Sequence, residues 1–370
     1  MRTISSQTLA LFFDLIRDRG YTLIAPTIRD SAIVYDEVLT PDDLPVAWTD
    51  IQAPGSNRLK KREDASYFGY AVGPHSWKKF PLPSHILLWK AQREEKGFSV
   101  VDATPAPRKL AFIGVRSCEL HALAIQDTIF IKGAHVDPFY RAQRENLFIV
   151  AVNCSTAGGT CFCVSMETGP KAQAGYDLAL TEVITDTQHY FVSEAGSEMG
   201  RDVLAALETR ESTETEKSAA ETVVENTAKT MGRTLDTTNI KTLLYENLEH
   251  PRWNDVANRC LTCGNCTAVC PTCFCTTVEE VADLTGEHSE HWRRWDSCFT
   301  MDFSFIHGEG SVRPSNKSRY RQWMTHKLGT WFDQFGTSGC VGCGRCITWC
   351  PPGIDITEEV AAIRENPCES

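Results

Sequence analysis

The chain has 370 residues, of which 42% are hydrophobic, and its formal net charge is −11. This length and apolar content fit two or three globular domains and exclude wholesale disorder. The acidic balance argues against a nucleic-acid partner, which requires a basic surface. No apolar run approaches the thickness of a bilayer, so we expect no membrane span.

Cysteine is the most informative residue type, with sixteen copies. A secreted disulfide scaffold does not explain them, because such scaffolds are small and no signal peptide is recognisable. The first twenty residues, interrupted by Asp14, Arg17 and Asp18, are typical of an amphipathic helix. A reducing compartment suits so many thiols, so we expect a cytoplasmic location.

Two short apolar runs, 110–115 and 147–152, are bounded by turn signals, and Ser117 can cap a helix over 119–129 between them. Strand, helix and strand at this separation predict a βαβ unit with parallel strands. Long loops are expected up to about residue 97. Further short strands are expected at 21–25, 32–35, 177–183 and 190–192.

A composition shift divides the chain. Residues 208–217 are charged and lack large apolar side chains, so we interpret 208–245 as a charged helical linker. We expect an α/β N-terminal domain with the βαβ unit over 1–207. Residues 246–370 are predicted to form an α+β or α-rich, two-cluster ferredoxin-like domain with a long insertion.

Two cysteine runs in this second half share the spacing C-x2-C-x2-C-x3-C-P. This is the bacterial ferredoxin pattern for [4Fe–4S] clusters, in which the cysteine before proline ligates the other cluster. Gly264 and Gly344 permit the loops to curl round a cluster. The predicted first site is Cys260, Cys263, Cys266 and Cys350, and the predicted second site is Cys340, Cys343, Cys346 and Cys270. Zinc sites or disulfides are the alternative, but zinc sites usually have two C-x-x-C pairs.

Four further cysteines, Cys118, Cys154, Cys161 and Cys163, form the predicted third site. Cys118 and Cys154 follow the two strands of the βαβ unit, whose carboxyl ends share one sheet edge. Cys118 also lies at a helix N-terminus, which favours a thiolate or an anionic cluster. Four cysteines are the number that a third [4Fe–4S] cluster needs, although buried thiols or zinc half-sites are alternatives.

Three more cysteines, Cys273, Cys275 and Cys298, define a further metal site, one ligand short of a cluster. His288 and His291 are near in sequence, although such histidines are more often ordinary hydrogen-bonding residues. Cys368 is interpreted as a tail thiol without function.

A basic stretch, 313–327, stands out in this acidic chain. In one interpretation, Arg319, Arg321, His326 and Lys327 offset cluster charge or dock an acidic partner. In the favoured one, the stretch is an amphipathic helix with Tyr320, Trp323 and the Lys327 stem packed inward.

Nucleotide and nucleophile motifs are missing from the sequence: there is no P-loop, no G-x-G-x-x-G after a strand, no H-E-x-x-H and no G-x-S-x-G. We therefore expect no flavin or NAD(P) on this chain and no catalytic site of its own. Clusters without a catalytic cofactor indicate an electron conduit. A redox-sensing or scaffold protein, or a dehydrogenase with a hidden flavin site, are alternatives.

Six motifs follow one another in the order of a known family: 114–120, 161–163, 260–266, 270–275, 293–298 and 340–346. The chain resembles the iron–sulfur beta subunit of sulfhydrogenase-type, NAD(P)-linked [NiFe] hydrogenases, a family that includes the A subunit of anaerobic sulfite reductase. One departure is Glu119, where the family often has Asp.

The resemblance implies a relay between a flavin- and NAD(P)-binding reductase subunit and a catalytic partner. That partner is either the small and large hydrogenase subunits or the catalytic subunit of a sulfite reductase. Residues 72–78 are more similar to the hydrogenase branch, so we expect a hydrogenase partner.

Overall fold

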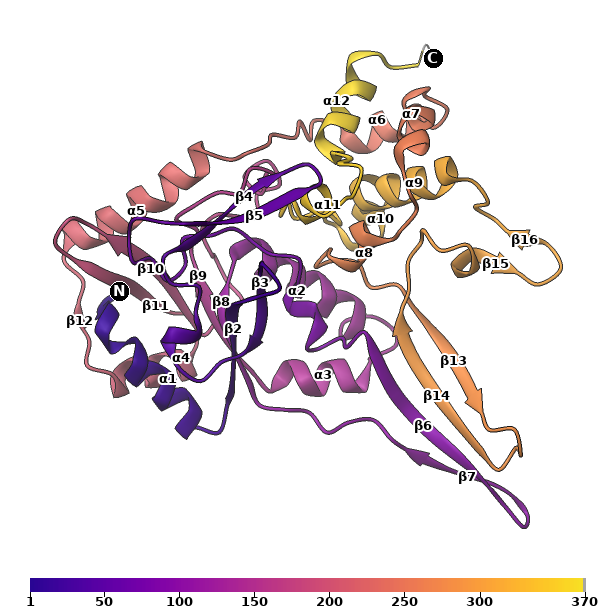
Figure 1. Ribbon diagram of the computed structural model, residues 1–370, viewed down its shortest axis with the longest axis horizontal. Helices are drawn as coiled ribbons and strands as arrows, with labels where there is room; N and C mark the ends of the chain where they lie inside the picture. Colours follow the sequence, from indigo (N-terminus) through magenta and orange to yellow (C-terminus); the bar gives the residue numbers. More distant parts are fainter. Residues whose placement is uncertain (369–370) are drawn as a thin grey trace.

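A large mixed sheet dominates the computed structural model, which describes residues 1–368 (Figure 1). Its strands are β1 (Arg2–Ser5), β2 (Thr22–Arg29), β3 (Ala32–Glu37), β8 (Leu110–Val115), β9 (Leu147–Val152), β10 (Leu178–Ile184), β11 (His189–Ala195) and β12 (Arg210–Glu211). They are ordered β12-β1-β11-β10-β9-β8-β2-β3. The neighbours from β2 to β10 run parallel, and the outer pairs run antiparallel.

The two strands at the centre of this sheet are buried along their whole length. Every residue of β8 and β9 is buried, because helices cover both faces of the sheet at this point. Both strands therefore read as continuous apolar runs in the sequence. Since they run parallel, their carboxyl ends open onto one edge, where Cys118 and Cys154 follow.

Helices cover the two faces of the sheet: α1 (Leu9–Asp18), α2 (Ser117–Phe130), α3 (Pro138–Glu145), α4 (Glu198–Ala206) and α5 (Glu214–Lys229). On one face, Phe13 of α1 and Val203 of α4 pack with Phe148 of β9. On the other, Leu123 of α2 packs against Phe112 of β8. The α/β character of this half agrees with the sequence prediction.

Helix α5 belongs to the segment that we predicted as a linker. It starts with a capping box between Thr213 and Glu216, and its Ala220 packs against Val183 and Val192 of the sheet. The charged sequence therefore hides an inner face with small apolar residues. The domain boundaries at 207 and 245 stay predictions.

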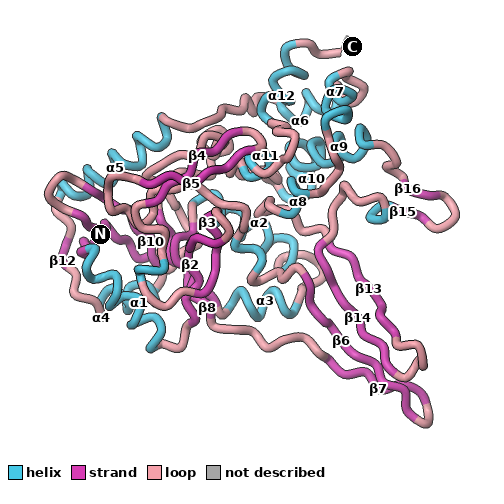
Figure 2. Tube along the Cα trace, viewed as in Figure 1, coloured by secondary structure: helices cyan, strands magenta, loops and turns pink. Residues whose placement is uncertain are grey.

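The expectation of long loops up to residue 97 is wrong. This region contains a hairpin of β4 (Trp48–Ala53) and β5 (Ser56–Lys61), and then β6 (His85–Glu94), which pairs with β7 (Gly97–Asp102). Strand β6 also pairs with β14 (His288–Trp295), which pairs with β13 (Thr276–Ala282). These four strands form an arm that projects from the body (Figure 2). Sequence missed β6 because a partner about 200 residues away completes its pairing.

The C-terminal half is helical. Its elements are α6 (Ile240–Glu246), α7 (Arg252–Arg259), α8 (Asn265–Ala268), α9 (Asn316–Thr325), the π-helical turn η5 (His326–Thr330), α10 (Trp331–Phe335), α11 (Arg345–Thr348), α12 (Ile356–Glu365) and the strands β15 (Phe305–Ile306) and β16 (Gly310–Ser311). A short 3-10 turn lies in this half at 302–304, and three others lie earlier in the chain at 6–8, 41–43 and 77–79. Trp253, Trp323 and Ile363 form part of its core. Within the described residues, no helix combines the length and the apolar character that a bilayer span requires.

An ion pair between Arg345 and Glu119 joins the two halves in the interior, where each residue is only 1% exposed. Glu119 lies in the first turn of α2, and Arg345 is the first residue of α11. The guanidinium also donates from Nε to the carbonyl of Gly73 (2.8 Å) and from Nη2 to that of His75 (2.9 Å). One side chain thus connects three segments that are distant in sequence.

Replacing Glu119 by Gln leaves the Arg345 charge buried without a partner. We expect a loss of about 3–5 kcal/mol of unfolding free energy, because removing one member of a buried pair strands the other. Anaerobic denaturant unfolding measures the loss. The exposed pair of Lys241 and Asp333 is the control, since Lys241→Met should cost about 1 kcal/mol or less. Equal losses in both variants would contradict the prediction.

Candidate metal centres

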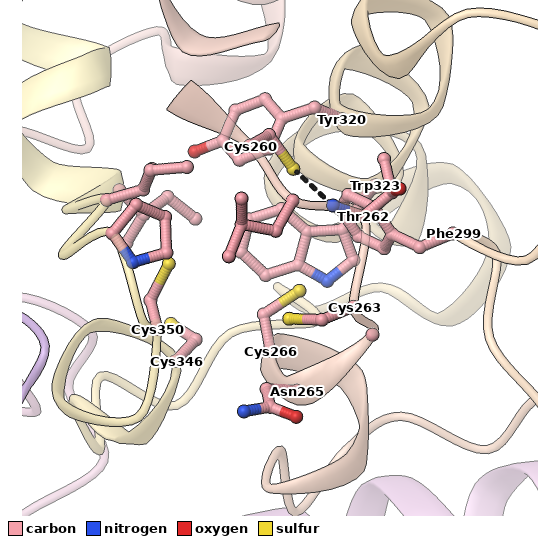
Figure 3. A pocket seen from close by; sticks show the side chains of 15 residues that line it. Cys260, Thr262, Cys263, Asn265, Cys266, Phe299, Tyr320, Trp323, Cys346 and Cys350 are labelled. Carbon is pink, nitrogen blue, oxygen red and sulfur yellow. Dashed lines mark hydrogen bonds between the residues drawn. The ribbon is translucent and has the colours of Figure 1, made fainter. Parts of the chain in front are cut away.

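The first site is a thiol-lined cavity in the helical half (Figure 3). Its empty volume is about 440 Å³. The thiols of Cys260, Cys263, Cys266 and Cys350 line it, together with Cys346. Aromatic and aliphatic side chains also line it: Phe299, Tyr320, Trp323, Ile354 and Ile356. Soft sulfur donors in an apolar cavity fit an iron–sulfur cluster.

The two cysteine runs fold alike. Gly264 (φ 75°) and Gly344 (φ 74°) take left-handed conformations and start the short helices α8 and α11. In each run, the backbone N–H two residues after the first cysteine donates to its sulfur. Thr262 donates to Cys260 Sγ and Gly342 to Cys340 Sγ, both at 3.4 Å. Backbone N–H···S bonds of this kind stabilise thiolate ligands.

The last cysteine of each run lies with the other run. Burial raises the pKa of Cys350, and the neighbouring Cys260 and Cys263 raise it further. Burial also raises the pKa of Cys346, to which Cys340, Cys343 and Cys270 add. Asn265, in the first run, donates from Nδ2 to the carbonyl of Trp349, next to Cys350 (3.2 Å). The structure thus brings together the two crossed sets; their ligation stays a prediction.

The four cysteines of the third site also converge. Burial raises the pKa of Cys163, and Cys154 and Cys161 raise it further. Burial also raises the pKa of Cys118, with contributions from Cys343 and Cys163. Cys343 belongs to the second site, so the second and third sites are neighbours. Their backbones touch, because Phe162 N–H donates to the carbonyl of Gly342 (2.8 Å).

Arg116, which sequence reasoning missed, lies beside the third site. It is fully buried and donates from Nη2 to the carbonyls of Phe68 (2.7 Å) and Tyr70 (3.0 Å). Burial raises the pKa of Cys154, and the Arg116 guanidinium opposes this rise. The signal was present, since Arg116 directly precedes the helix that starts at Ser117.

The further site is less complete. Burial raises the pKa of Cys298 to about 12, with a contribution from Cys275, while Cys273 forms a hydrogen bond with Cys270. His291 lies out on the arm, where it stacks on Trp89 with ring centroids 4.4 Å apart. The structure therefore does not bring His291, or His288 beyond it on β14, to these thiols.

Within residues 1–368, no three His, Cys, Asp or Glu side chains are arranged to chelate a single metal ion. A cubane requires a wider arrangement, because each of its four irons takes its own thiolate. The crossed thiol sets, the left-handed glycines and the apolar walls fit such a group.

Two buried lysines lie against the cysteines. Lys78 is 3% exposed and donates from Nζ to the carbonyl of Cys273 (3.0 Å). Lys327 is 5% exposed, and its Nζ lies 3.4 Å from Cys270 Sγ. Burial lowers the pKa of Lys327, but Cys270, Cys273 and Cys340 raise it well above its ordinary value. A hydrogen bond from Cys273 and the charges of both lysines hold the pKa of Cys270 well below its ordinary value, against the effect of burial.

Both interpretations of the basic stretch 313–327 hold, each for different residues. Tyr320 and Trp323 are buried, which confirms the inward-packed helix. Lys327 is also buried, and its ammonium group contacts the sulfur of Cys270, as the charge-offset alternative predicts for this residue. Arg321 instead pairs with Glu249 at the surface (2.7 Å).

Comparisons with known proteins agree with this site. A family described as a 4Fe–4S dicluster domain matches residues 259–354, and a second family with the same description matches residues 216–274. The chain is 27% identical over 368 residues to sulfhydrogenase 2 subunit beta of Pyrococcus furiosus, covering 98% of each protein. The chain is thus similar to a sulfhydrogenase beta subunit along almost its whole length. The prediction of [4Fe–4S] clusters is confirmed. No solved structure is significantly similar to the chain.

The two turn glycines provide a matched pair of substitutions. A Cβ on Gly344 would lie 2.4 Å from the carbonyl oxygen of Thr160, whereas one on Gly264 would meet nothing nearer than Ser297 Oγ at 3.4 Å. Gly264→Ala should cost about 1–2 kcal/mol for the left-handed backbone alone. Gly344→Ala should cost about 1–3 kcal/mol more, because the backbones must separate. Anaerobic unfolding compares the two, and equal losses would contradict a tight contact at Thr160.

Proposed function

We propose that the chain is the iron–sulfur electron-transfer subunit of a hydrogenase complex. It relays electrons between a flavin- and NAD(P)-binding reductase subunit and the small and large subunits of a [NiFe] hydrogenase. The observation that supports this proposal is the row of adjoining cysteine groups that runs from the helical half into the α/β half. Similarity to a protein named as a sulfhydrogenase subunit supports the nature of the complex.

The row has two junctions. Cys346 of the second site also lines the cavity of the first. Cys343 of the second site contributes to the raised pKa values of Cys118 and Cys163 in the third, after burial. Neighbouring clusters exchange single electrons, so three clusters in this order make a conduit across the boundary between the halves.

Each part of the chain has a role in this proposal. Bound clusters supply one-electron redox chemistry. The thiolates hold them in place, and Phe299, Tyr320 and Trp323 exclude water from the first site. Backbone N–H groups donate to sulfur, and buried cations offset negative charge near the second and third sites.

The first site is the more exposed end of the row. Cys263 is exposed, and the neighbouring Leu261 is 64% exposed. The buried thiols of Cys340 and Cys343 are inside the row. We place one partner at the exposed end and the other near Cys154, and the complex in the cytoplasm, where thiols stay reduced. Catalysis belongs to the partners in this proposal, and this chain binds neither flavin nor NAD(P).

The alternative is the electron-transfer A subunit of an anaerobic sulfite reductase or another flavin-based complex. Anaerobic purification of the intact complex separates the two, since nickel in the partner supports the hydrogenase and sirohaem supports the sulfite reductase. NAD(P)H should reduce the clusters only when the flavoprotein partner is present. Clusters that the partner cannot reduce would indicate a scaffold or sensor. Flavin on the isolated chain would indicate a dehydrogenase.

Crossed ligation predicts which cluster each substitution damages. Cys270→Ser should weaken the cluster of Cys340, Cys343 and Cys346, and leave that of Cys260, Cys263 and Cys266 intact. Cys350→Ser should do the reverse. Electron paramagnetic resonance of the reduced variants distinguishes the two clusters. Damage confined to the run that carries the substitution would overturn the crossing.

A third cluster predicts a metal count. Three four-iron clusters require about twelve irons and twelve acid-labile sulfides per chain. Cys161→Ser should remove about a third of both, because it breaks only the third site. Cys368→Ser is the control, since this exposed tail thiol lies outside all three sites. A count of about eight irons that Cys161→Ser leaves unchanged would reduce the third site to buried thiols.

A further inference from the structure

Lys327 lies in an unusual piece of backbone. Helix α9 ends at Thr325, and the chain continues as the π-helical turn η5 over His326–Thr330. Such turns are rare and occur often at functional sites, because the wider turn changes the direction of the side chains. Here Lys327 is buried, whereas most lysines keep the ammonium in water.

All three N–H donors of this ammonium have partners. Nζ lies 3.4 Å from Cys270 Sγ, 2.9 Å from Thr272 Oγ1 and 3.1 Å from the carbonyl oxygen of Gly339. Cys270 ends the first cysteine run, and Gly339 directly precedes Cys340 of the second. The three hydrogen bonds fix the charge at the point where the two runs meet.

Within residues 1–368, no carboxylate forms an ion pair with Lys327. A buried ammonium without a counter-charge is costly, so the compensating negative charge must come from sulfur. Cys270 is the thiol in contact. Each ferredoxin-type site has a backbone N–H···S bond, from Thr262 to Cys260 and from Gly342 to Cys340. Among residues 1–368, only the second set also receives a hydrogen bond from an ammonium group.

We propose that Lys327 sets the direction of electron transfer between the two sites. Its fixed charge raises the reduction potential of the second site above that of the first. Reduction adds one negative charge to a cluster, and a cation in contact with a ligand sulfur stabilises the reduced form. An electron that enters at the exposed first site is then drawn inward to the second. This inference rests on the proposed assignment of Cys270 to the second site.

The test is a potentiometric titration of the purified chain with its clusters, followed by electron paramagnetic resonance. Lys327→Gln keeps a hydrogen-bonding side chain and removes the charge. It should make the second site at least tenfold harder to reduce, a shift of about 59 mV for one electron, and leave the first site unchanged. Lys327→Arg should restore most of the potential. Lys241→Gln is the control, since this lysine is partly exposed and pairs with Asp333.

An unchanged second potential in Lys327→Gln, or equal shifts at both sites, would overturn the proposal. Loss of the second cluster in Lys327→Gln but not in Lys327→Arg would support the need for charge, and loss in both would show a packing role and overturn it. Cys270→Ser tests the assignment independently. If that variant keeps the second cluster intact, the ligand assignment fails, whatever Lys327 does. Potentials of the isolated chain do not depend on which partner it serves.

Discussion

The structure depends on how closely the second cysteine run fits against the α/β half. Arg345 and Glu119 pair in the interior, and the neighbouring glycines press on the loop that carries the third site. At Gly342, an added Cβ would lie 2.6 Å from the Cα of Cys163. Such an approach leaves no room for a side chain between the two loops, so the second and third sites lie directly against each other.

Two connections join the halves of the chain: the buried Arg345–Glu119 pair and the arm. A charged pair in the interior is a weak source of net stability, since the desolvation of both ions offsets much of their attraction. Its value here is the register that it imposes on α2 and α11, because a displaced α11 would leave both charges unpaired. The arm adds a second connection, with β6 from one half paired to β14 from the other. The composition shift near residues 208–245 therefore does not separate two independently packed parts, since strands and side chains from both sides of it pair with each other.

Short spacings made part of this site predictable. Two repeats of C-x2-C-x2-C-x3-C-P specify a local loop, and the continuous apolar runs of β8 and β9 specify a buried parallel centre, which places Cys118 and Cys154 at one edge. Lys78 carried no such signal, and Arg116 carried only its position directly before the helix that starts at Ser117. Their importance arises from burial, which segments distant in sequence create, and a single sequence cannot distinguish a buried lysine from an exposed one. The arm escaped prediction for the same reason.

The distribution of charge follows from these buried residues. The chain carries a net charge of −11, and bound clusters with their thiolates add negative charge in the interior. Three cations lie beside cysteines and are almost fully buried: Lys78, Lys327 and Arg116. Other cations, such as Arg17, Lys229 and Arg321, instead form ion pairs at the surface. Buried charges are screened by water and salt much less than surface charges, so each acts more strongly on its neighbouring sulfur than a surface charge does. The chain is acidic as a whole but carries buried positive charges beside its cysteines. These charges stabilise electrons that are added along the row of cysteines.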